Sequence, residues 1–189
     1  MKNKIIVITA PSGSGKTTLV KRLLEASPNL EFSVSASTRD PRDYEVHTKD
    51  YYFYSVEYFK KLIEEDAFVE WEMVYKGKYY GTLKSEMERI WHNYRTPLVD
   101  IDVKGAIAIL EKYRDITLSI FIEAPSVDEL RRRLVARGTE SDHSLEERLT
   151  KASYEISFAS KFDYILINDD LEKATAELIN VVNDFLKKE

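Results

Sequence analysis

The stretch KIIVITAPSGSGKTTLVKRLL, residues 4–24, contains three structural signals in a fixed order. It begins with KIIVIT, an apolar and β-branched run that is typical of a strand buried on both faces. It ends with KTTLVKRLL, whose leucines share one stripe of a helix that we expect to run from Lys16 to about Ala26. The small residues APSGSG lie between them. A buried strand, a glycine-rich turn and a helix are the surroundings of a phosphate-binding loop with the pattern G-x-x-x-x-G-K-S/T.

The loop matches that pattern at every position except the first, where Ala10 replaces glycine. This position ends the strand and requires a small residue more than a positive φ, so we expect the loop to form. Gly13 and Gly15 allow backbone N–H groups to point at phosphate oxygens, and the helix N-terminus adds partial positive charge. Lys16 supplies a full charge for the outer phosphates, and the Thr17 hydroxyl is placed to bind Mg²⁺. A plain glycine-rich turn with a surface lysine is the alternative, which the flanking strand and helix oppose.

The rest of the chain predicts an α/β fold, a P-loop parallel sheet core flanked by helices. Further buried-strand signals occur at 97–101, 116–122 and 164–167, and helical patterns separate them. Such alternation implies right-handed crossovers and ligands at the carboxyl ends of the strands. Residues 33 to about 82 are instead rich in short aromatic and β-branched runs, with one helical stretch near 56–65. We interpret them as a small, mostly antiparallel insertion.

Later helices carry signals at their starts. Ser126-x-x-Glu129 and Ser144-x-x-Glu147 each fit a capping box ahead of an apolar-periodic run. The last helix, from about 171 to 186, is expected to cover one face of the sheet.

Composition excludes several classes of protein. The chain of 189 residues has a formal net charge of -5, which argues against broad nucleic-acid binding, because such binding needs a basic face. It contains no cysteine and no apolar run of about 18 residues, so we expect no disulfide, no membrane span and a cytoplasmic location. Positive charge gathers at Arg39 and Arg42 and again at 131–137. For the second group, a solvated helix face is the simplest interpretation of the residues alone.

The segment VDID, residues 99–102, places two carboxylates at the end of an apolar run. Strand alternation predicts that Asp100 and Asp102 share one face with Ile101 opposite, at the edge where open α/β sites form. Two like charges so close are costly unless a ligand or cation uses them.

Together with the loop, a series of segments resembles guanylate kinases in the same order along nearly the whole chain. These segments are SVSASTRDPR (33–42), KDYYF (49–53), VEWEMV (69–74), YYGT (79–82), VDIDVKG (99–105), RLVARGTES (133–141), ERL (147–149) and IND (167–169). The resemblance implies an enzyme that uses ATP and Mg²⁺ to convert GMP, or dGMP, to the diphosphate. It also implies three parts: a P-loop core (1–32, 83–125 and 151–189), a GMP-binding insertion (33–82) and a lid (126–150).

By the same resemblance, Arg39 and Arg42 bind the GMP phosphate with help from the hydroxyls of Tyr51 and Tyr80. Two guanidinium groups that flank Pro41 can hold a dianion bidentately. Without the surrounding segments, an ordinary surface turn would be the better interpretation of Arg-Asp-Pro-Arg.

Recognition of guanine needs acceptors for its N1–H and amino group, and a donor for O6. Carried over from the family, Glu70 and Asp102 fit the first need, and the hydroxyls of Ser35 and Thr82 fit the second. Adenine would set a lone pair against a carboxylate, and such mispairing can discriminate by roughly 10⁴ to 10⁵. The alternative for Glu70 is an exposed strand carboxylate opposite a buried Trp71.

The donor side also follows from the resemblance. It assigns ATP binding to Ala10, Pro11, Ser12, Gly13, Ser14, Gly15, Lys16, Thr17, Thr18, Arg133, Arg137 and Asn168, and the metal to Thr17 and, through water, Asp100. It assigns catalysis to Lys16, Arg39, Arg137 and Arg148. No side-chain nucleophile is needed, because an oxygen of the GMP phosphate attacks, and one well-placed arginine can contribute about 10³ to 10⁵ in rate.

Two departures and two alternatives accompany this assignment. Where the family commonly has glycine, the chain has Tyr44 and Thr48, which we expect to reshape the turn between Arg42 and Tyr51.

A non-catalytic interaction module of the same family is expected to lack the P-loop lysine or the lid arginines. A kinase of another phosphorylated acceptor, such as a ribose bisphosphate, would leave the base-reading residues without a partner. The sequence leaves the oligomeric state open.

Overall fold

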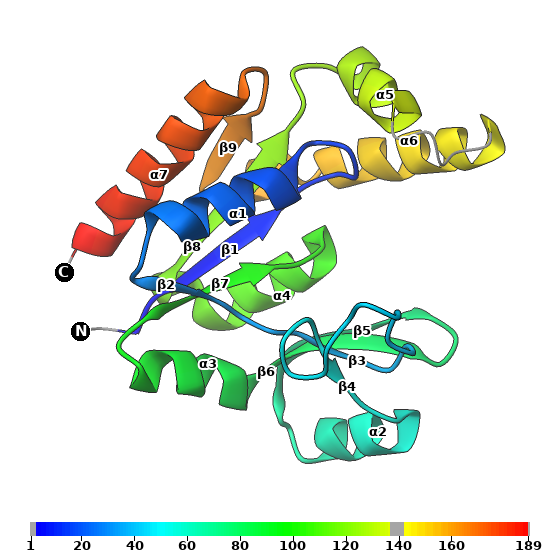
Figure 1. Ribbon diagram of the computed structural model, residues 1–189, viewed down its shortest axis with the longest axis vertical. Coiled ribbons are helices and arrows are strands. Elements are labelled where there is room, and N and C mark those ends of the chain that lie inside the picture. The colour runs from blue at the N-terminus through cyan, green and yellow to red at the C-terminus, as the bar shows by residue number, and fades with distance from the viewer. Residues whose placement is uncertain (1–2, 137–141, 189) are drawn as a thin grey trace.

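Two β-sheets organise the chain (Figure 1). The computed structural model describes residues 3–136 and 142–188, and only the helical backbone of 142–144. The core sheet has five parallel strands in the order β2-β7-β1-β8-β9. Its strands are β1 (Ile5–Thr9), β2 (Leu30–Phe32), β7 (Thr96–Asp100), β8 (Thr117–Glu123) and β9 (Tyr164–Ile167). The predicted fold class, a parallel core flanked by helices with a smaller sheet beside it, is confirmed.

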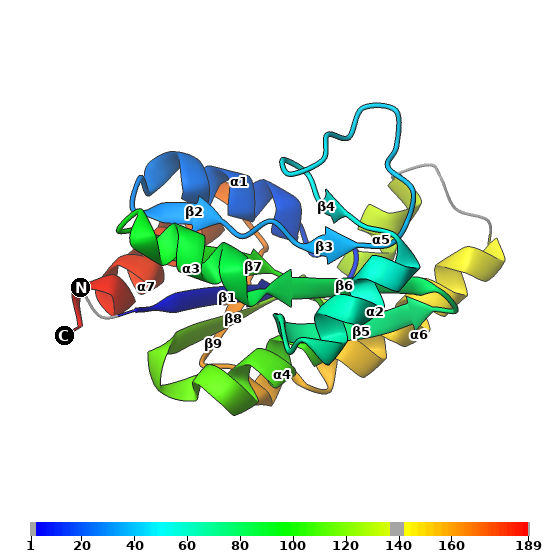
Figure 2. The ribbon, with the colours of Figure 1, turned by 90° about the horizontal axis from the view of Figure 1, so that it is seen from below.

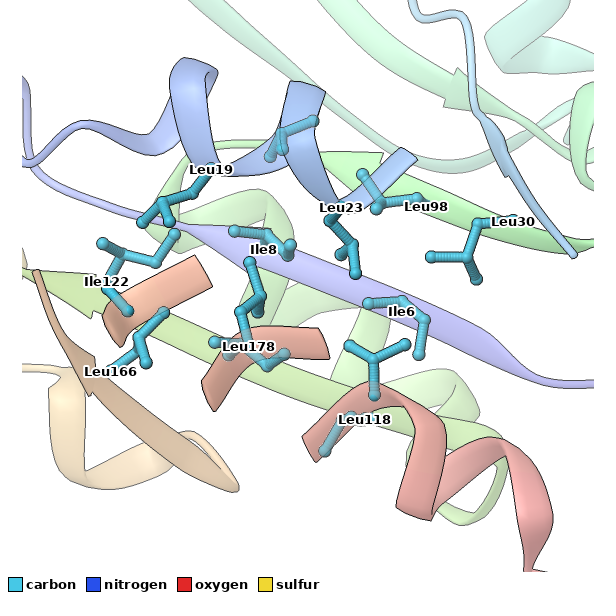
Figure 3. Close-up of a cluster of buried hydrophobic side chains, with 14 residues drawn as sticks. Ile6, Ile8, Leu19, Leu23, Leu30, Leu98, Leu118, Ile122, Leu166 and Leu178 are labelled. Carbon is cyan, nitrogen blue, oxygen red and sulfur yellow. The ribbon is translucent and has the colours of Figure 1, made fainter. Parts of the chain in front are cut away.

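Helices cover both faces of the core sheet. They are α1 (Lys16–Ala26) and α7 (Leu171–Lys187) on one face, and α3 (Lys84–His92) and α4 (Val103–Tyr113) on the other. The central strand β1 alternates between the two layers, since successive side chains of a strand point to opposite faces. Ile6 and Ile8 pack with α1 and α7 (Figure 3), whereas Ile5 and Val7 pack with α3 and α4. This double burial explains why KIIVIT is a continuous apolar run.

The strand β2 was not predicted. The four other core strands and α1 lie within one or two residues of their predicted bounds. The segment Leu30–Phe32 is three residues long with a glutamate at its centre, which is too short for a periodic pattern. Its pairing with β7 makes it a strand at the edge of the core sheet.

The second sheet lies beside the core (Figure 2) and has the order β4-β3-β6-β5. Its elements are β3 (Ala36–Ser37), β4 (Tyr52–Phe53), β5 (Phe68–Tyr75) and β6 (Lys78–Leu83), with α2 (Val56–Glu64) packed against it. The β5–β6 and β3–β6 pairs are antiparallel and the β3–β4 pair is parallel, so the sheet is mostly antiparallel, as predicted. Phe59 of α2 stacks on Phe68 at 4.4 Å between ring centroids.

Of two further helices, α5 (Val127–Ala136) lies in the predicted lid, and α6 (Asp142–Ile156) begins there and continues past its predicted end at residue 150. Glu129 N donates to Ser126 Oγ at 3.1 Å, so the first predicted cap is confirmed. The second prediction was wrong, because α6 begins at Asp142 and Ser144 therefore lies inside the helix.

Short 3₁₀ turns, η1 (Arg114–Ile116) and η2 (Ala159–Lys161), precede β8 and β9. In the part of the chain that the structure describes, no helix combines the length and the apolar character needed to traverse a bilayer.

The segment between β3 and β4 retains a left-handed turn. Thr48 has φ 70°, and its N–H donates to Tyr51 O at 2.8 Å. A β-branched residue is strained at positive φ, whereas glycine adopts it freely. The chain therefore keeps, at Thr48, the conformation that glycine would adopt without strain.

We expect Thr48→Gly to stabilise the protein by about 0.5–1 kcal/mol, because relief of strain exceeds the entropic cost of glycine. Thermal unfolding should show a rise in Tm of roughly 1–4 °C. Tyr44→Gly is the matched control, since Tyr44 is not among the described residues with positive φ. An equal rise in both variants would show that strain at Thr48 is not the cause.

Candidate active site

A cavity of about 370 Å³ lies between the core and the second sheet, which we call the inter-sheet cavity. Its volume falls in the range of small-molecule sites. The predicted site residues that line it are Lys16, Ser35, Tyr51, Glu70, Tyr80, Asp100 and Asp102. Residues from six separate segments of the chain therefore line one cavity beside the carboxyl end of β7.

Glu70 and Thr82 form a buried polar pair beside this cavity. They face each other across the β5–β6 ladder, and Glu70 is only 7% exposed. Within the described residues, neither Glu70 Oε1 nor Thr82 Oγ1 has a hydrogen-bond partner. Burial raises the pKa of Glu70 to about 7, and the nearby carboxylates of Asp102 and Glu72 act in the same direction. The alternative for Glu70 was wrong, because it is Trp71 that is exposed, at 45%.

The two aspartates of VDID reach the cavity by different routes. The strand β7 ends at Asp100, and Asp102 is the N-cap of α4, where its Oδ1 accepts from Gly105 N at 2.8 Å. The prediction that strand alternation aligns them was therefore wrong in its geometry, although both side chains line the inter-sheet cavity. The cap fixes the direction of the Asp102 side chain.

Lys16 connects the phosphate-binding loop to this acidic edge. Its ammonium group forms an ion pair with the Asp100 carboxylate and donates to Ile101 O at 3.3 Å. Gly13 and Gly15 have φ 95° and 88°, as the loop pattern requires. The lysine thus lies where the loop, β1 and β7 end together.

Asn168 is hydrogen-bonded to the backbone of the phosphate-binding loop. It is 5% exposed, and its Nδ2 donates to Ser14 O at 2.8 Å. A Cβ built on Gly15 would collide with the same amide nitrogen. Arg133 in turn donates to Asn168 O at 2.9 Å and to Glu129 Oε1 at 2.7 Å. Asn168 thus contacts the loop and α5, and its backbone N–H donates to Glu123 O of β8 at 2.8 Å. Arg137 lies outside the described residues.

A second cavity of about 290 Å³, the loop cavity, lies over the phosphate-binding loop. Its lining consists of Ala10, Pro11, Ser12, Gly13, Gly15, Lys16, Thr17, Arg148, Lys151 and Glu155. Arg148 donates to Ser12 Oγ at 3.4 Å. Lys151 and Glu155 were not predicted as site residues; they follow Arg148 at helical spacings of three and seven residues and so share its face of α6.

Arg39, Tyr51 and Tyr80 form a cluster on the second sheet, where both tyrosines line the inter-sheet cavity. The Arg39 guanidinium carbon lies 4.8 Å from the Tyr51 ring centroid, and the Tyr51 and Tyr80 rings are 6.3 Å apart. Both terminal nitrogens of Arg39 donate to Glu45, at 2.5 and 2.6 Å. This hydrogen bonding lowers the pKa of Glu45 to about 2.

Arg42 does not join this cluster. Its side chain is 64% exposed and donates to Tyr44 Oη at 3.0 Å. Its backbone N–H donates to Glu45 at 2.8 Å. Tyr44, one of the departures from the family pattern, therefore supplies a partner for Arg42.

Other lining residues of the inter-sheet cavity were also missed. Glu72 and Val74 follow Glu70 with the two-residue period of a strand, which could have identified them. Glu72 pairs with Lys104 at 3.0 Å. Asp50 and Tyr75 lie in a loop and at a strand end, where no periodic pattern marks them.

Comparison with known proteins gives consistent matches. A sequence model of the family described as Guanylate kinase matches residues 2–185. The guanylate kinase of Bacteroides thetaiotaomicron is 46% identical over 189 residues, covering 100% of this chain and 93% of that protein. The guanylate kinase of Porphyromonas gingivalis is 46% identical over 186 residues, covering 98% of this chain and 99% of that protein.

Solved structures extend the comparison. The crystal structure of guanylate kinase from Anaplasma phagocytophilum has a TM-score of 0.77 and 32% identity, covering 98% of this chain and 87% of that chain. Shikimate kinase from Bacteroides thetaiotaomicron has a TM-score of 0.53 at 16% identity, which indicates a shared fold alone. From the family match and the full-length relatives, the chain belongs to the guanylate kinase family.

Proposed function

We propose that this protein transfers the γ-phosphoryl group of ATP to GMP, giving ADP and GDP, and that it also accepts dGMP. The observation that carries the proposal is the buried carboxylate of Glu70, which lines a cavity that Lys16 also lines and whose Oε1, like the hydroxyl of its cross-strand neighbour Thr82, has no hydrogen-bond partner among the described residues. Buried polar atoms require partners, and a nucleobase edge would supply them. Membership of the guanylate kinase family supports both substrates.

Guanine fits the polar groups of the cavity. Its N1–H and amino group would donate to the Glu70 carboxylate, and its O6 would accept from a hydroxyl of Ser35 or Thr82. Adenine would present a lone pair to Glu70 and leave it without a donor. The inter-sheet cavity therefore favours a purine that carries both an amino and a keto group.

The phosphates would meet between the two cavities. The GMP phosphate would bind Arg39, Tyr51 and Tyr80, with Arg42 closing from the surface, and the ATP phosphates would lie on the loop. An oxygen of the GMP phosphate then attacks the γ-phosphorus, while the bond between the γ-phosphorus and the oxygen that leaves with ADP breaks. Lys16 and Arg148 would neutralise the charge that develops on the transferred group.

Magnesium fits the oxygen donors that the site offers. Thr17 exposes its hydroxyl on the first turn of α1, and Asp100 lies beside Lys16. Both groups are the hard oxygen ligands that Mg²⁺ prefers. Among the described residues there is no group of three or more potential ligands from His, Cys, Asp and Glu, so phosphate oxygens and water would complete the shell. Bound Mg²⁺ would neutralise part of the phosphate charge.

We also propose the three-part division into a core (1–32, 83–125 and 151–189), an insertion (33–82) and a lid (126–150). Support comes from the second sheet, whose strands and helix fall between Ala36 and Leu83. A cytoplasmic location follows from the proposed substrates, which are cytoplasmic metabolites.

A panel of acceptors tests the proposal. Purified protein is assayed with ATP and Mg²⁺ against GMP, dGMP, AMP, CMP and UMP. We expect GMP to lead, dGMP to follow and the other three to be far behind. Equal turnover of AMP would reject the base-reading role of Glu70, and the absence of any turnover would favour a non-catalytic module.

The KM for GMP should depend on pH through Glu70. Ionised Glu70 can accept from both guanine donors, whereas protonated Glu70 keeps one acceptor oxygen and turns an O–H donor toward the second guanine donor. Since its pKa is raised to about 7, GMP binding should tighten as pH rises from 6 to 8. Steady-state kinetics across this range measure the effect. Glu70→Gln is the control, because it removes this titration and leaves that of the GMP phosphate. A pH dependence that is identical in both proteins would contradict the assignment.

A further inference from the structure

A buried carboxylate lies behind the inter-sheet cavity. Glu86 on α3 is 2% exposed and accepts four hydrogen bonds. Its donors are Val34 N at 3.1 Å, Tyr52 Oη at 2.8 Å, and Arg89 Nε and a terminal nitrogen of Arg89 at 2.8 and 3.0 Å. Burial opposes the charge, but the bonds from Arg89, Tyr52 and Val34 outweigh it and lower the pKa of Glu86. The group is therefore a fully partnered carboxylate.

Two of these donors lie next to predicted GMP-binding residues. Val34 immediately precedes Ser35, and Tyr52 immediately follows Tyr51. The two segments also bond to each other, since Tyr52 N donates to Ser35 O at 2.9 Å. Ser35 and Tyr51 line the inter-sheet cavity, whereas Glu86 does not. Glu86 thus contacts the cavity wall from its outer side.

The same network reaches the core sheet. Arg89 pairs with Glu31 of β2 at 2.7 Å, and Arg95 pairs with the same carboxylate at 3.3 Å. The helix α3 also packs Met87 into the core cluster that contains Val99 of β7. Glu86 is therefore held in place relative to the strand that ends at the cavity.

We propose that Glu86 is a positioning residue for GMP binding. It holds the segments that carry Ser35 and Tyr51 at a fixed place relative to the core, and it acts through them without touching the nucleotide. A buried carboxylate with four donors restricts the orientation of every group that it binds, because each broken bond would leave a charged oxygen unpaired. This inference rests on the proposed function, since it assumes that GMP occupies the inter-sheet cavity.

Two conservative variants test the inference. Tyr52→Phe removes one hydroxyl donor and leaves the other three hydrogen bonds to Glu86. Glu86→Gln keeps the shape of the side chain but replaces one acceptor oxygen by an NH₂ group, which then faces the N–H and O–H groups that donated to that oxygen. We expect both to weaken GMP binding by about five- to tenfold, the effect of losing one good hydrogen bond. Calorimetry with GMP alone measures the affinity, and steady-state kinetics should show a matching rise in the KM for GMP with an unchanged KM for ATP.

Arg114→Gln is the matched control, because it breaks an exposed pair with Asp163, a residue that precedes β9. It should leave both KM values unchanged. If Glu86→Gln does not fold, Tyr52→Phe alone decides. Variants that bind GMP as the wild type does while their Tm falls would overturn the inference, as would an equal rise in both KM values. Wild-type protein that gives no heat with GMP would overturn the proposed function and this inference with it.

Discussion

Lys16→Ala should lower kcat for GMP phosphorylation by about 10²- to 10³-fold, the usual result of removing one preorganised group that stabilises a transition state. Lys16 lies at the junction of the two cavities, paired with Asp100 and bonded to Ile101 O. It is the one lysine that lines both the loop cavity and the inter-sheet cavity in the described part of the chain. Without the Lys16 ammonium group, the negative charge on the transferred phosphoryl group would not be neutralised. The fold would lose only the partly exposed ion pair between Lys16 and Asp100.

Lys21→Ala provides the comparison for this result. Lys21 lies on the same helix and points to solvent, with a 3.9 Å pair to Glu25. Its removal should leave kcat unchanged and alter Tm little, because exposed pairs contribute about 0–1 kcal/mol. A large drop in Tm for Lys16→Ala, with kcat changed only in proportion to the folded fraction, would indicate a structural lysine.

Glu70→Gln should reduce the preference for GMP over AMP by about 10²-fold or more, out of the roughly 10⁴ to 10⁵ that such a site can provide. The glutamine amide offers one acceptor, so one guanine donor would face an N–H group. The NH₂ of the glutamine amide could instead donate to N1 of adenine. The acceptor panel, repeated with this variant, measures the ratio of kcat/KM values. Glu72→Gln, two residues along the same strand, is the matched control, and an equal loss of selectivity there would assign the effect to net charge.

The same substitution should stabilise the fold at alkaline pH. The pKa of Glu70 is raised from 4.5 to about 7, so the folded state binds the proton more tightly than the unfolded state does. Wild-type stability therefore falls as pH rises from 4.5 through 7, and glutamine removes that loss. The gain should reach on the order of 3 kcal/mol above pH 7, less the cost of burying an amide, and should vanish near pH 4.5. Chemical denaturation at pH 5 and pH 8 measures it, and a gain that is larger at pH 5 would contradict the sign.

The sequence predicted the loop and most of the core because these features follow from short local rules. The run KIIVIT needs only burial on two faces, and Gly13 and Gly15 need only positive φ. The proposed base-reading role of Glu70 and Thr82 came from resemblance, and burial of Glu70 could not be deduced from its own strand, where it alternates with Trp71.

What the sequence left out depends on tertiary contacts. The strand β2 exists because it pairs with β7, and a three-residue segment carries no period of its own. Asp102 looked like part of a strand, but the turn into α4 uses it as a cap. Arg89 follows Glu86 at the three-residue spacing of a helix, but the bonds from Glu86 to residues 34 and 52 join distant segments whose separations give no pattern.

The helix α5 is seated directly on the phosphate-binding loop. A Cβ at Gly13 would lie 3.1 Å from Leu130 and 3.2 Å from Leu134, so the bare Cα of this glycine is the surface on which the helix packs. Gly13 is thus one point of direct contact between the loop and helices α5 and α6, alongside the hydrogen bond from Arg148 of α6 to Ser12. Packed interiors transmit displacement with little compression. A displacement of the loop backbone, such as a bound triphosphate would cause, would therefore be transmitted to α5 through this contact and to α6 through the bond from Arg148 to Ser12.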